Sequence, residues 1–288
     1  MVEKSETFQR QKILLHETYQ YLKRDSKYIF NAIGLWFAIF KLNFEIGDPF
    51  RSTYYFFRQI DDVLDGDRQV AQEPITYANM VINALTKDEF DDKKYPILKA
   101  AKTSVDYLEK VKKSDDKPKE LMVQLIEAMM TDNLRMRTGL VLPQEKLYEE
   151  YSKQFYPMHN LQLICVGSNV RFNNKFDKFP LLQARIQSLS DLEKDWNKNL
   201  KNIPLEVWEK SRIDPHGLNY EEIIQLSIVR YWMFKEAAKC KKDLAETKRL
   251  LMVEFQGKNE KYAKFIYGGL IFGLENRLKK ILRETKGI

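Results

Sequence analysis

The chain has 288 residues, a length that suits one large domain or two of ordinary size, and 44% of them are hydrophobic, enough for a substantial core. Two cysteines and three scattered histidines exclude a disulfide framework and offer no zinc-ligand spacing. The net charge of +7 favours an anionic partner, and we take the basic excess to be spread along the chain. No basic arm or nucleic-acid motif stands out, so we expect no nucleic-acid partner.

The N-terminal stretch MVEKSETFQRQK lacks the apolar segment of a signal peptide. The most apolar run, residues 29–40 (IFNAIGLWFAIF), is shorter than a membrane span and predicts a buried helix. We expect no membrane anchor in the C-terminal stretch LENRLKKILRETKGI. A cytoplasmic protein is therefore expected, with transient contact to a membrane surface kept as an alternative.

Proline positions predict how the chain is divided into helices. Eight of the nine prolines lie where we expect helices to break: Pro49, Pro74, Pro96, Pro118, Pro143, Pro180, Pro204 and Pro215. Between them apolar residues recur at steps of three and four, as in LMVQLIEAMMTDNLRM and LLQARIQSLSDLEKDW, and strand-like alternation is missing. Pro157 lies inside an otherwise helical segment and predicts a kink. The sequence predicts an all-α protein with a single domain from residue 1 to residue 288.

Residues 54–67 (YYFFRQIDDVLDGD) place carboxylates directly beside an aromatic run. On a helix Asp61 and Asp65 share one face, where like charges repel, so the pair costs stability unless a cation lies between them. Arg58 stands one turn earlier and is expected to orient a carboxylate or to contact a ligand, with an exposed helix ion pair as the alternative. The stretch fits either a metal site or an acidic surface turn.

A second acidic pair, Asp191 and Asp195 in SLSDLEKDWNKN, repeats the four-residue spacing on a further predicted helix. Among 41 acidic residues such pairs also arise by chance. Magnesium prefers oxygen ligands, and proteins usually provide one or two carboxylates while substrate phosphates and water complete the shell. Two facing pairs therefore suit a metal cluster that clamps a diphosphate. Three nearby lysines would add countercharge: Lys194, Lys198 and Lys201.

These motifs resemble those of the squalene and phytoene synthase family. The pattern Y-x-x-x-R-x-x-D-D-x-x-D over residues 54–65 is similar to the first aspartate-rich motif of that family. LIEAMMTD, which ends at Asp132, is similar to its middle helix. DLEKD followed by IPLEVW is similar to its second motif and the segment after it. A looser match, SKYIF at residue 26, is similar to the Ser-rich segment that contacts diphosphate.

The resemblance implies a class I isoprenoid synthase: a helical bundle around a central apolar cavity. In such an enzyme Mg²⁺ ions hold prenyl diphosphates and promote ionisation of the leaving group, while aromatic residues line the pocket for the apolar tail. By this resemblance the metal-binding residues are Asp61, Asp62, Asp65, Asp191 and Asp195, and all of these except Asp62 are catalytic. Substrate contacts are assigned to Tyr54, Arg58, Asp62, Asp132, Gln187, Lys194, Lys198 and Lys201.

Several positions depart from the family pattern. Where the family has an Asn and an Arg before the first aspartate of its second motif, this chain has Gln187 and Ser190. Leu200 and Asn202 replace the Arg and Tyr that follow, and FYPMHN at 155–160 replaces the small-residue segment V-A-G-x-V-G. We therefore expect an intact first diphosphate site and a remodelled second one, where neutral residues do not offset the charge of a second diphosphate.

The leading interpretation is a magnesium-dependent enzyme that joins two prenyl diphosphates head to head and releases diphosphate. An alternative is a family member with one prenyl diphosphate site, which cyclises its substrate or passes the prenyl group to another acceptor. The non-enzymatic alternatives are a scaffold that kept the fold and a helical adaptor outside the family. The prenyl chain length, the use of NADPH and the oligomeric state stay open.

Overall fold

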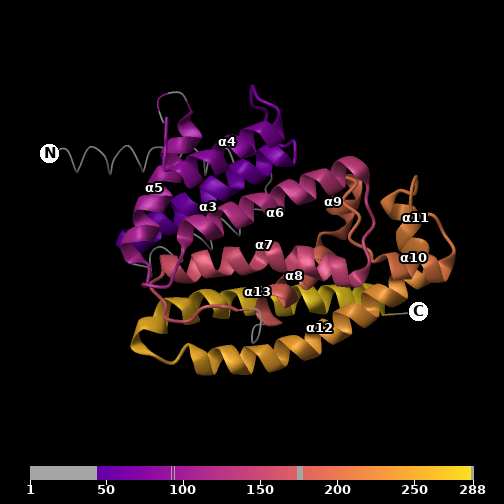
Figure 1. The fold of residues 1–288 in the computed structure, drawn as a ribbon. Helices are drawn as coiled ribbons and strands as arrows, with labels where there is room; N and C mark the ends of the chain where they lie inside the picture. Colours follow the sequence, from indigo (N-terminus) through magenta and orange to yellow (C-terminus); the bar gives the residue numbers. More distant parts are fainter. Residues whose placement is uncertain (1–43, 92, 94, 174–177, 287–288) are drawn as a thin grey trace. The chain divides into compact units, whose positions relative to one another are not determined.

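The computed structural model describes residues 44–91, 93, 95–173 and 178–286. These residues form eleven α-helices, α3 to α13, and one short 3₁₀-helix, η2, with no strand in the described ranges (Figure 1). The all-α prediction is therefore confirmed. Within this part of the chain, no helix has the length and apolar composition that a bilayer span requires. The apolar run at 29–40 and the SKYIF stretch lie outside the described residues.

The chain divides into two compact units. The first ends at Lys119 and also includes Ile164–Gly167, and the second comprises Glu120–Leu163 and Ser168–Ile288. The long helices α6 (Pro118–Thr138) and α7 (Gln144–Cys165) belong mainly to the second unit. The single-domain organisation from residue 1 to residue 288 stays a prediction.

The first unit contains α3 (Phe44–Leu64), α4 (Pro74–Lys87) and α5 (Pro96–Val111). The three helices pack against one another through apolar residues at helical spacing, among them Phe56, Ile60, Val81, Leu85, Ala101 and Leu108. Both α4 and α5 begin with proline, whose fixed φ and missing N–H suit the first helical position. The Thr76 amide donates to the Glu73 carboxylate at 2.9 Å, which caps α4.

The second unit continues after α7 with three longer and three short helices. These are α8 (Lys178–Ser190), α9 (Leu192–Asn197), α10 (Leu205–Ser211), α11 (Tyr220–Gln225), α12 (Ser227–Glu254) and α13 (Lys261–Thr285). Helices α12 and α13 pack on each other and on α8, while α10 and α11 contact α12 and α9 contacts α8. The second aspartate motif begins directly after α8, the helix that packs on both α12 and α13.

Aromatic rings from four segments form the centre of the second unit. Phe172, Phe179 and Tyr267 surround His159 with ring centroids 5.4–5.5 Å from its own, and Phe255 packs on Tyr267 at 5.1 Å. His159 Nδ1 and the Tyr267 hydroxyl share a hydrogen bond of 2.8 Å. Burial lowers the pKa of His159 to about 3, so the imidazole is neutral and structural.

Most predicted helix breaks are confirmed. Prolines begin α4, α5 and α6, and Pro143, Pro204 and Pro215 lie outside helices. Two predicted breaks are wrong. Pro49 lies within α3, which begins earlier than expected, and Pro180 lies in the first turn of α8, where a missing N–H costs no hydrogen bond. Pro157 lies inside α7, as predicted.

Candidate functional site

The first aspartate motif lies on α3, in the first unit. Arg58 is three residues before Asp61 and four before Asp62, so one guanidinium reaches both carboxylates along the helix. Its Nη1 atom lies 2.6 Å from Asp61 Oδ2, and its Nη2 atom lies 2.6 Å from Asp62 Oδ1. The planar fork of arginine suits this double contact and fixes the directions of the two carboxylates.

These carboxylates stand at the C-terminal end of their helix. The helix ends one residue before Asp65, and Gly66 adopts the left-handed conformation with a φ of +76°. The helix dipole places partial negative charge at this end, where a cation is favoured by about 0.3–1 kcal/mol and an anion has the opposite preference. The last turn of α3 carries no basic residue. Asp61 and Asp62 thus lie in a field that favours a cation.

The surroundings of the first motif are largely apolar. Asp62 is only 8% exposed, and Phe56 and Phe57 are buried one to two turns earlier on the same helix. Tyr54, the first residue of the motif, packs edge to face on Tyr55 with ring centroids 5.6 Å apart. Aspartates and aromatic rings are therefore adjacent, as the sequence predicts, and the low exposure of Asp62 strengthens its contact with the guanidinium.

The second aspartate motif lies where α8 ends and α9 begins, in the second unit. Asp191 separates the two helices, so the single helix predicted over this stretch is wrong. The Asp195 amide nevertheless donates to the Asp191 carbonyl at 2.9 Å, which keeps the four-residue helical step between the carboxylates. The Asp191 side chain is 51% exposed, whereas Asp195 is partly buried. One carboxylate of the pair is therefore exposed to solvent, and the other is partly buried.

A chain of hydrogen bonds joins Asp195 to Asp132 through a buried arginine. Asn202 Nδ2 donates to Asp195 Oδ2 at 2.9 Å. Arg135 donates from Nη2 to Asn202 Oδ1 at 2.8 Å and to the Lys201 carbonyl at 3.0 Å. Its Nη1 atom donates to Asp132 Oδ1 at 3.0 Å. The middle-helix aspartate is thus connected to the second motif.

Neither Arg135 nor Asn202 is assigned to the site from the sequence. A signal for Arg135 exists, because it stands three residues after Asp132 on one helix, a spacing at which opposite charges pair. Asn202 is noted only as a departure from the family pattern. Nothing local marks it, because its bond to Arg135 spans 67 residues of sequence.

Asp195 carries a carboxyl group whose ionised form is disfavoured. Burial and the negative charge of Asp191 raise its pKa to about 7, and Asp132 adds to this in the same direction. The hydrogen bond from Asn202 and the charge of Lys194 act the other way. A cation near the three aspartates would relieve this repulsion, because it favours the ionised form.

This raised pKa predicts a pH-dependent effect of Asp195→Asn on stability. Because the folded pKa of about 7 exceeds the ordinary 3.8, the stability contributed by the protonated group is fully present below pH 3.8 and is lost as pH rises through about 7. Asparagine is neutral throughout, so its stabilising effect should grow between about pH 4 and about pH 7 and stay constant above that. Thermal unfolding followed by circular dichroism measures this, and a pH-independent difference would contradict the assignment.

The lysines expected to supply countercharge differ in their surroundings. Lys201 is only 5% exposed, and its Nζ atom lies 3.6 Å from the centre of the Trp196 ring. Burial lowers the pKa of this lysine. Lys194 is exposed next to Asp195, and Lys198 follows as the C-cap of α9. Lys201 is therefore engaged with an aromatic ring, and Lys194 is the lysine whose charge acts on Asp195.

Arg277 of α13 brings a guanidinium to the second motif from a distant part of the sequence. Its Nη1 atom donates to Ser190 Oγ at 2.7 Å and lies 3.7 Å from Asp191 Oδ1. Gln187 contributes through its backbone carbonyl, which accepts the Asp191 amide at 2.8 Å. We expected only neutral residues at the positions around the second motif where the family has arginines. This is wrong in one respect, because Ser190 accepts a hydrogen bond from Arg277.

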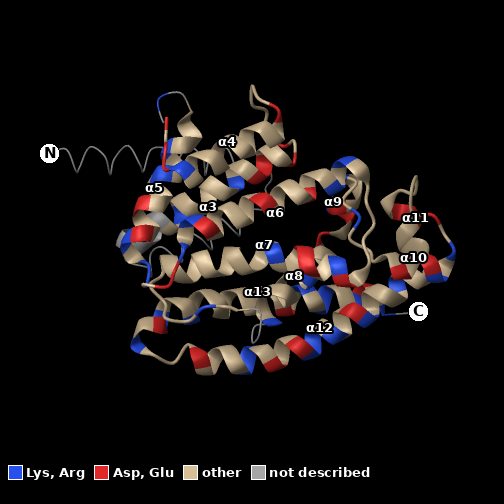
Figure 2. Ribbon diagram, in the orientation of Figure 1, with Lys and Arg blue, Asp and Glu red and all other residues tan. Residues whose placement is uncertain are grey.

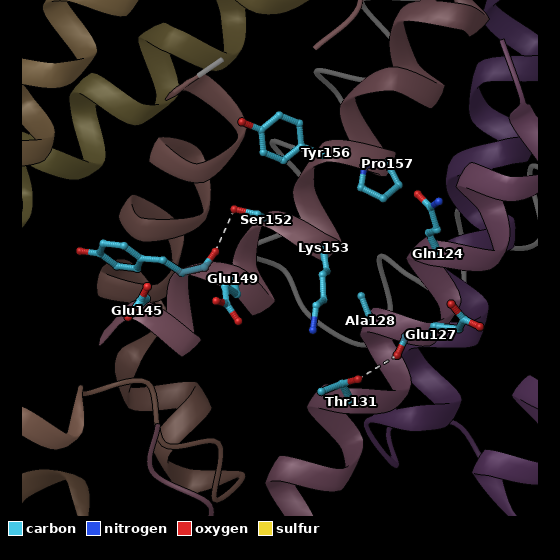
Figure 3. A pocket seen from close by; sticks show the side chains of 11 residues that line it. Gln124, Glu127, Ala128, Thr131, Glu145, Glu149, Ser152, Lys153, Tyr156 and Pro157 are labelled. Carbon is cyan, nitrogen blue, oxygen red and sulfur yellow. Dashed lines mark hydrogen bonds between the residues drawn. The ribbon is translucent and has the colours of Figure 1, made fainter. Parts of the chain in front are cut away.

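A pocket of about 860 Å³ lies between α6 and α7 (Figure 3). It is lined by Gln124, Glu127, Ala128 and Thr131 of α6 and by Glu145, Tyr148, Glu149, Ser152, Lys153, Tyr156 and Pro157 of α7. Figure 3 shows Lys153 extending into the space between the helices. Most of the lining residues have charged or polar side chains, and none of them is a predicted site residue. The central apolar cavity stays a prediction.

The structure places the predicted aspartates in two sets. Asp61 and Asp62 on α3, with Asp65 directly after it, lie in the first unit, and Asp132, Asp191 and Asp195 lie in the second unit. That the sets face each other stays a prediction. Across the described ranges, no group of three or more His, Cys, Asp or Glu side chains is arranged to hold a metal ion. Magnesium is usually bound in proteins by one or two carboxylates, while substrate oxygens and water complete its coordination shell, and the carboxylates of each set suit this kind of site.

Neither a protein-family model, nor a curated protein, nor a solved structure matches this chain.

Proposed function

We propose that the chain is a magnesium-dependent enzyme acting on prenyl diphosphates, with head-to-head condensation of two such substrates as the leading reaction. The observation that carries the proposal is the end of α3, where the guanidinium of Arg58 aligns Asp61 and Asp62 in a field that favours a cation. The second set adds support, because burial and the negative charges of Asp191 and Asp132 raise the pKa of Asp195. Carboxylates in such positions suit a divalent cation that carries a diphosphate.

Each residue of the two sets has a distinct part in this proposal. Magnesium, when bound, supplies a Lewis acid that polarises the diphosphate leaving group. Arg58 sets the directions of the first-motif carboxylates, and Asn202 sets that of Asp195 by donating to its Oδ2 atom. Arg135 holds Asn202 in place, and Arg277 offsets negative charge beside the second motif. The residues that would hold the metal are Asp61, Asp62, Asp65, Asp191 and Asp195.

A reaction with one prenyl diphosphate, by cyclisation or by transfer to a different acceptor, is the second candidate. The cation–π contact of Lys201 with Trp196 favours this second candidate, because the ammonium group lies over the Trp196 ring and is not positioned to offset the charge of a second diphosphate. Arg135 is likewise committed to Asp132 and Asn202. A second diphosphate would therefore depend mainly on Arg277 and on exposed lysines, which lack the guanidinium fork.

Calorimetric titration with a non-ionisable prenyl thiodiphosphate and magnesium separates the two candidates. We expect two sites of unequal affinity, and we expect Arg277→Gln to weaken the second about tenfold, the loss of one charge-assisted contact of about 1.4 kcal/mol. Arg283→Gln, an exposed residue of the same helix, is the matched control. Two equally tight sites would contradict the remodelled second site, and one site would favour the single-substrate reaction.

Product analysis tests the proposed function itself. The chain is incubated with geranyl, farnesyl or geranylgeranyl diphosphate and magnesium, and products are identified by mass spectrometry while released diphosphate is measured. A product with two prenyl groups supports condensation, and a cyclic product or an adduct with an added acceptor supports the second candidate. If no donor yields metal-dependent release of diphosphate, the enzyme proposal is wrong and a scaffold role is favoured.

A further inference from the structure

One face of helix α12 is exposed along almost its whole length. The buried residues of the helix, from Val229 to Leu251, follow a single stripe, and the helix packs on α8 and α13. On the opposite side seven exposed residues recur at steps of three or four, and they are Tyr231, Lys235, Lys239, Lys242, Glu246, Arg249 and Val253. Their mean spacing is close to the 3.6 residues of a helical turn, so the side chains form one straight row about 33 Å long. We call this row the outer stripe.

Two acids of α12 are held on the inner side of the helix. Glu236 is 9% exposed, and its Oε1 atom accepts from Arg185 Nε at 2.6 Å and from the Tyr148 hydroxyl at 2.8 Å. Asp243 Oδ2 lies 3.2 Å from Arg185 Nη1. A buried guanidinium needs carboxylate partners, and Arg185 is only 7% exposed. Because these two acids are engaged inside the unit, Glu246 is the one acid that the outer stripe displays.

The outer stripe carries more positive than negative charge, with four cations and one acid. Lys239, Lys242 and Arg249 form no ion pair with any other residue in the described ranges. Lys235 Nζ lies 5.0 Å from the centre of the Tyr231 ring. Cations without an ion-pair partner in the chain keep their charge available to an anionic group that approaches from outside.

Helices α12 and α13, with the segment between them, hold the basic excess of the chain. Residues 227–285 contain fourteen Lys and Arg against seven Asp and Glu, an excess equal to the net charge of +7 of the whole chain. The interpretation that the excess is spread along the chain is therefore wrong. Figure 2 shows basic segments recurring along α12. A charge excess concentrated on these helices attracts an acidic partner to them.

We propose that the outer stripe binds an acidic helical segment of a partner protein. A helix that lies along α12 meets the stripe at steps of three and four residues, as paired helices do in coiled coils. Its Glu and Asp side chains would lie opposite the four cations, and charge pairs of this kind decide which partner binds and in which register. The inference stands apart from the proposed reaction and does not depend on it.

Three features of the stripe select this partner. Glu246 lies among the cations, where the phosphates of nucleic acid or of anionic lipid would repel it, whereas a helix can place a Lys or Arg opposite it. Tyr231 and Val253, near the two ends of the stripe, are 48% and 59% exposed and would contact apolar side chains of the partner. A second copy of the chain would bring an equal excess of positive charge and be repelled.

Fluorescence anisotropy with the full chain and a labelled helical peptide tests the proposal. The peptide is as long as the stripe and carries Glu at the positions that face the four cations, Lys opposite Glu246 and Leu at both ends. We expect saturable binding that weakens as salt is raised. A scrambled peptide of the same composition, whose Glu residues do not share one helical face, should bind about tenfold more weakly or less.

Charge reversal on the stripe probes the contact. Lys239→Glu with Lys242→Glu is expected to weaken binding of the peptide about tenfold or more, because each new carboxylate faces a carboxylate of the peptide. Far-UV circular dichroism should stay unchanged, since both side chains are exposed. A peptide with Lys in place of the Glu residues that face positions 239 and 242 should restore binding to this variant, a rescue that a structural defect would not allow.

Lys241→Glu is the matched control for Lys242→Glu, because the two exposed lysines are neighbours in the sequence. Lys241 lies seven residues before Lys248, whose Nζ atom is 2.8 Å from Glu275 Oε1 on α13. It is therefore on the flank of α12 beside α13 and off the stripe. We expect Lys242→Glu to weaken binding about threefold or more, and Lys241→Glu to bind as the unchanged chain does.

Lys99→Glu with Lys110→Glu on α5 changes the net charge as much as the double variant of the stripe and should leave binding unchanged. If either control weakens binding as much as the stripe variants, if the scrambled peptide binds as tightly as the designed one, or if the designed peptide does not bind, the proposal is wrong. Duplex DNA or phosphatidylserine vesicles that bind more tightly than the peptide and displace it would assign the stripe to those polyanions and overturn the proposal.

Discussion

Asp61→Asn and Asp65→Asn are expected to abolish turnover of prenyl diphosphates while leaving the helices intact. Each change removes a carboxylate that would hold the cation in a partly buried site, a loss of about 3–4 kcal/mol in the transition state, or roughly 10²–10³-fold in rate. Without metal, Asp65→Asn should be no less stable than the unchanged chain, because it removes repulsion at the end of α3. Asp61→Asn should cost up to about 1 kcal/mol, because it also breaks the ion pair of Asp61 with Arg58. Diphosphate release with magnesium and thermal unfolding measure the two effects.

Asp106→Asn is the matched control for these variants. Asp106 lies on α5 of the same unit, is exposed, and pairs with Lys102 at 3.1 Å, so its loss should cost little in either measurement. Near-normal rates for Asp61→Asn would remove the first motif from the site. A loss of helicity along with activity would instead make Asp61 a structural residue.

Arg135→Met is expected to produce the largest loss of stability among these changes, about 3–5 kcal/mol. Arg135 is buried and donates to Asp132, to Asn202 and to the Lys201 carbonyl. Methionine fills a similar space but leaves these acceptors without their donor, and a buried acceptor that loses its partner is costly. Urea unfolding measures the free energy difference.

Arg137→Met is the control, because Arg137 lies two residues later on the same helix and is exposed. Arg135→Lys should fall between the two, since an ammonium keeps the charge but cannot bridge three acceptors in the geometry of a guanidinium. If Arg135→Met costs less than about 1 kcal/mol, the buried network does not support the second motif.

The sequence by itself determined the helical class and several of the local arrangements in the candidate site. Apolar residues at steps of three and four, and prolines whose missing N–H suits a helix start, act within a few residues of the chain. The start of α4 at Pro74 and the start of α5 at Pro96 therefore follow from local chemistry. The reach of Arg58 to Asp61 and Asp62 does too, because helical spacing alone brings the three together.

Tertiary structure alone decided the surroundings of the second motif. Arg277 meets Ser190 across 87 residues of sequence, and Asn202 meets Arg135 across 67, so no local pattern marks either contact. The pKa of Asp195 depends on burial and on charges from other segments, which only packing brings near. Charges and hydrogen bonds depend on which groups lie close in space, whereas a periodic pattern reports only on residues that are close in the sequence. The sequence pattern alone therefore indicates that an arginine is missing at Ser190, whereas the structure shows that Arg277 of α13 donates to this serine.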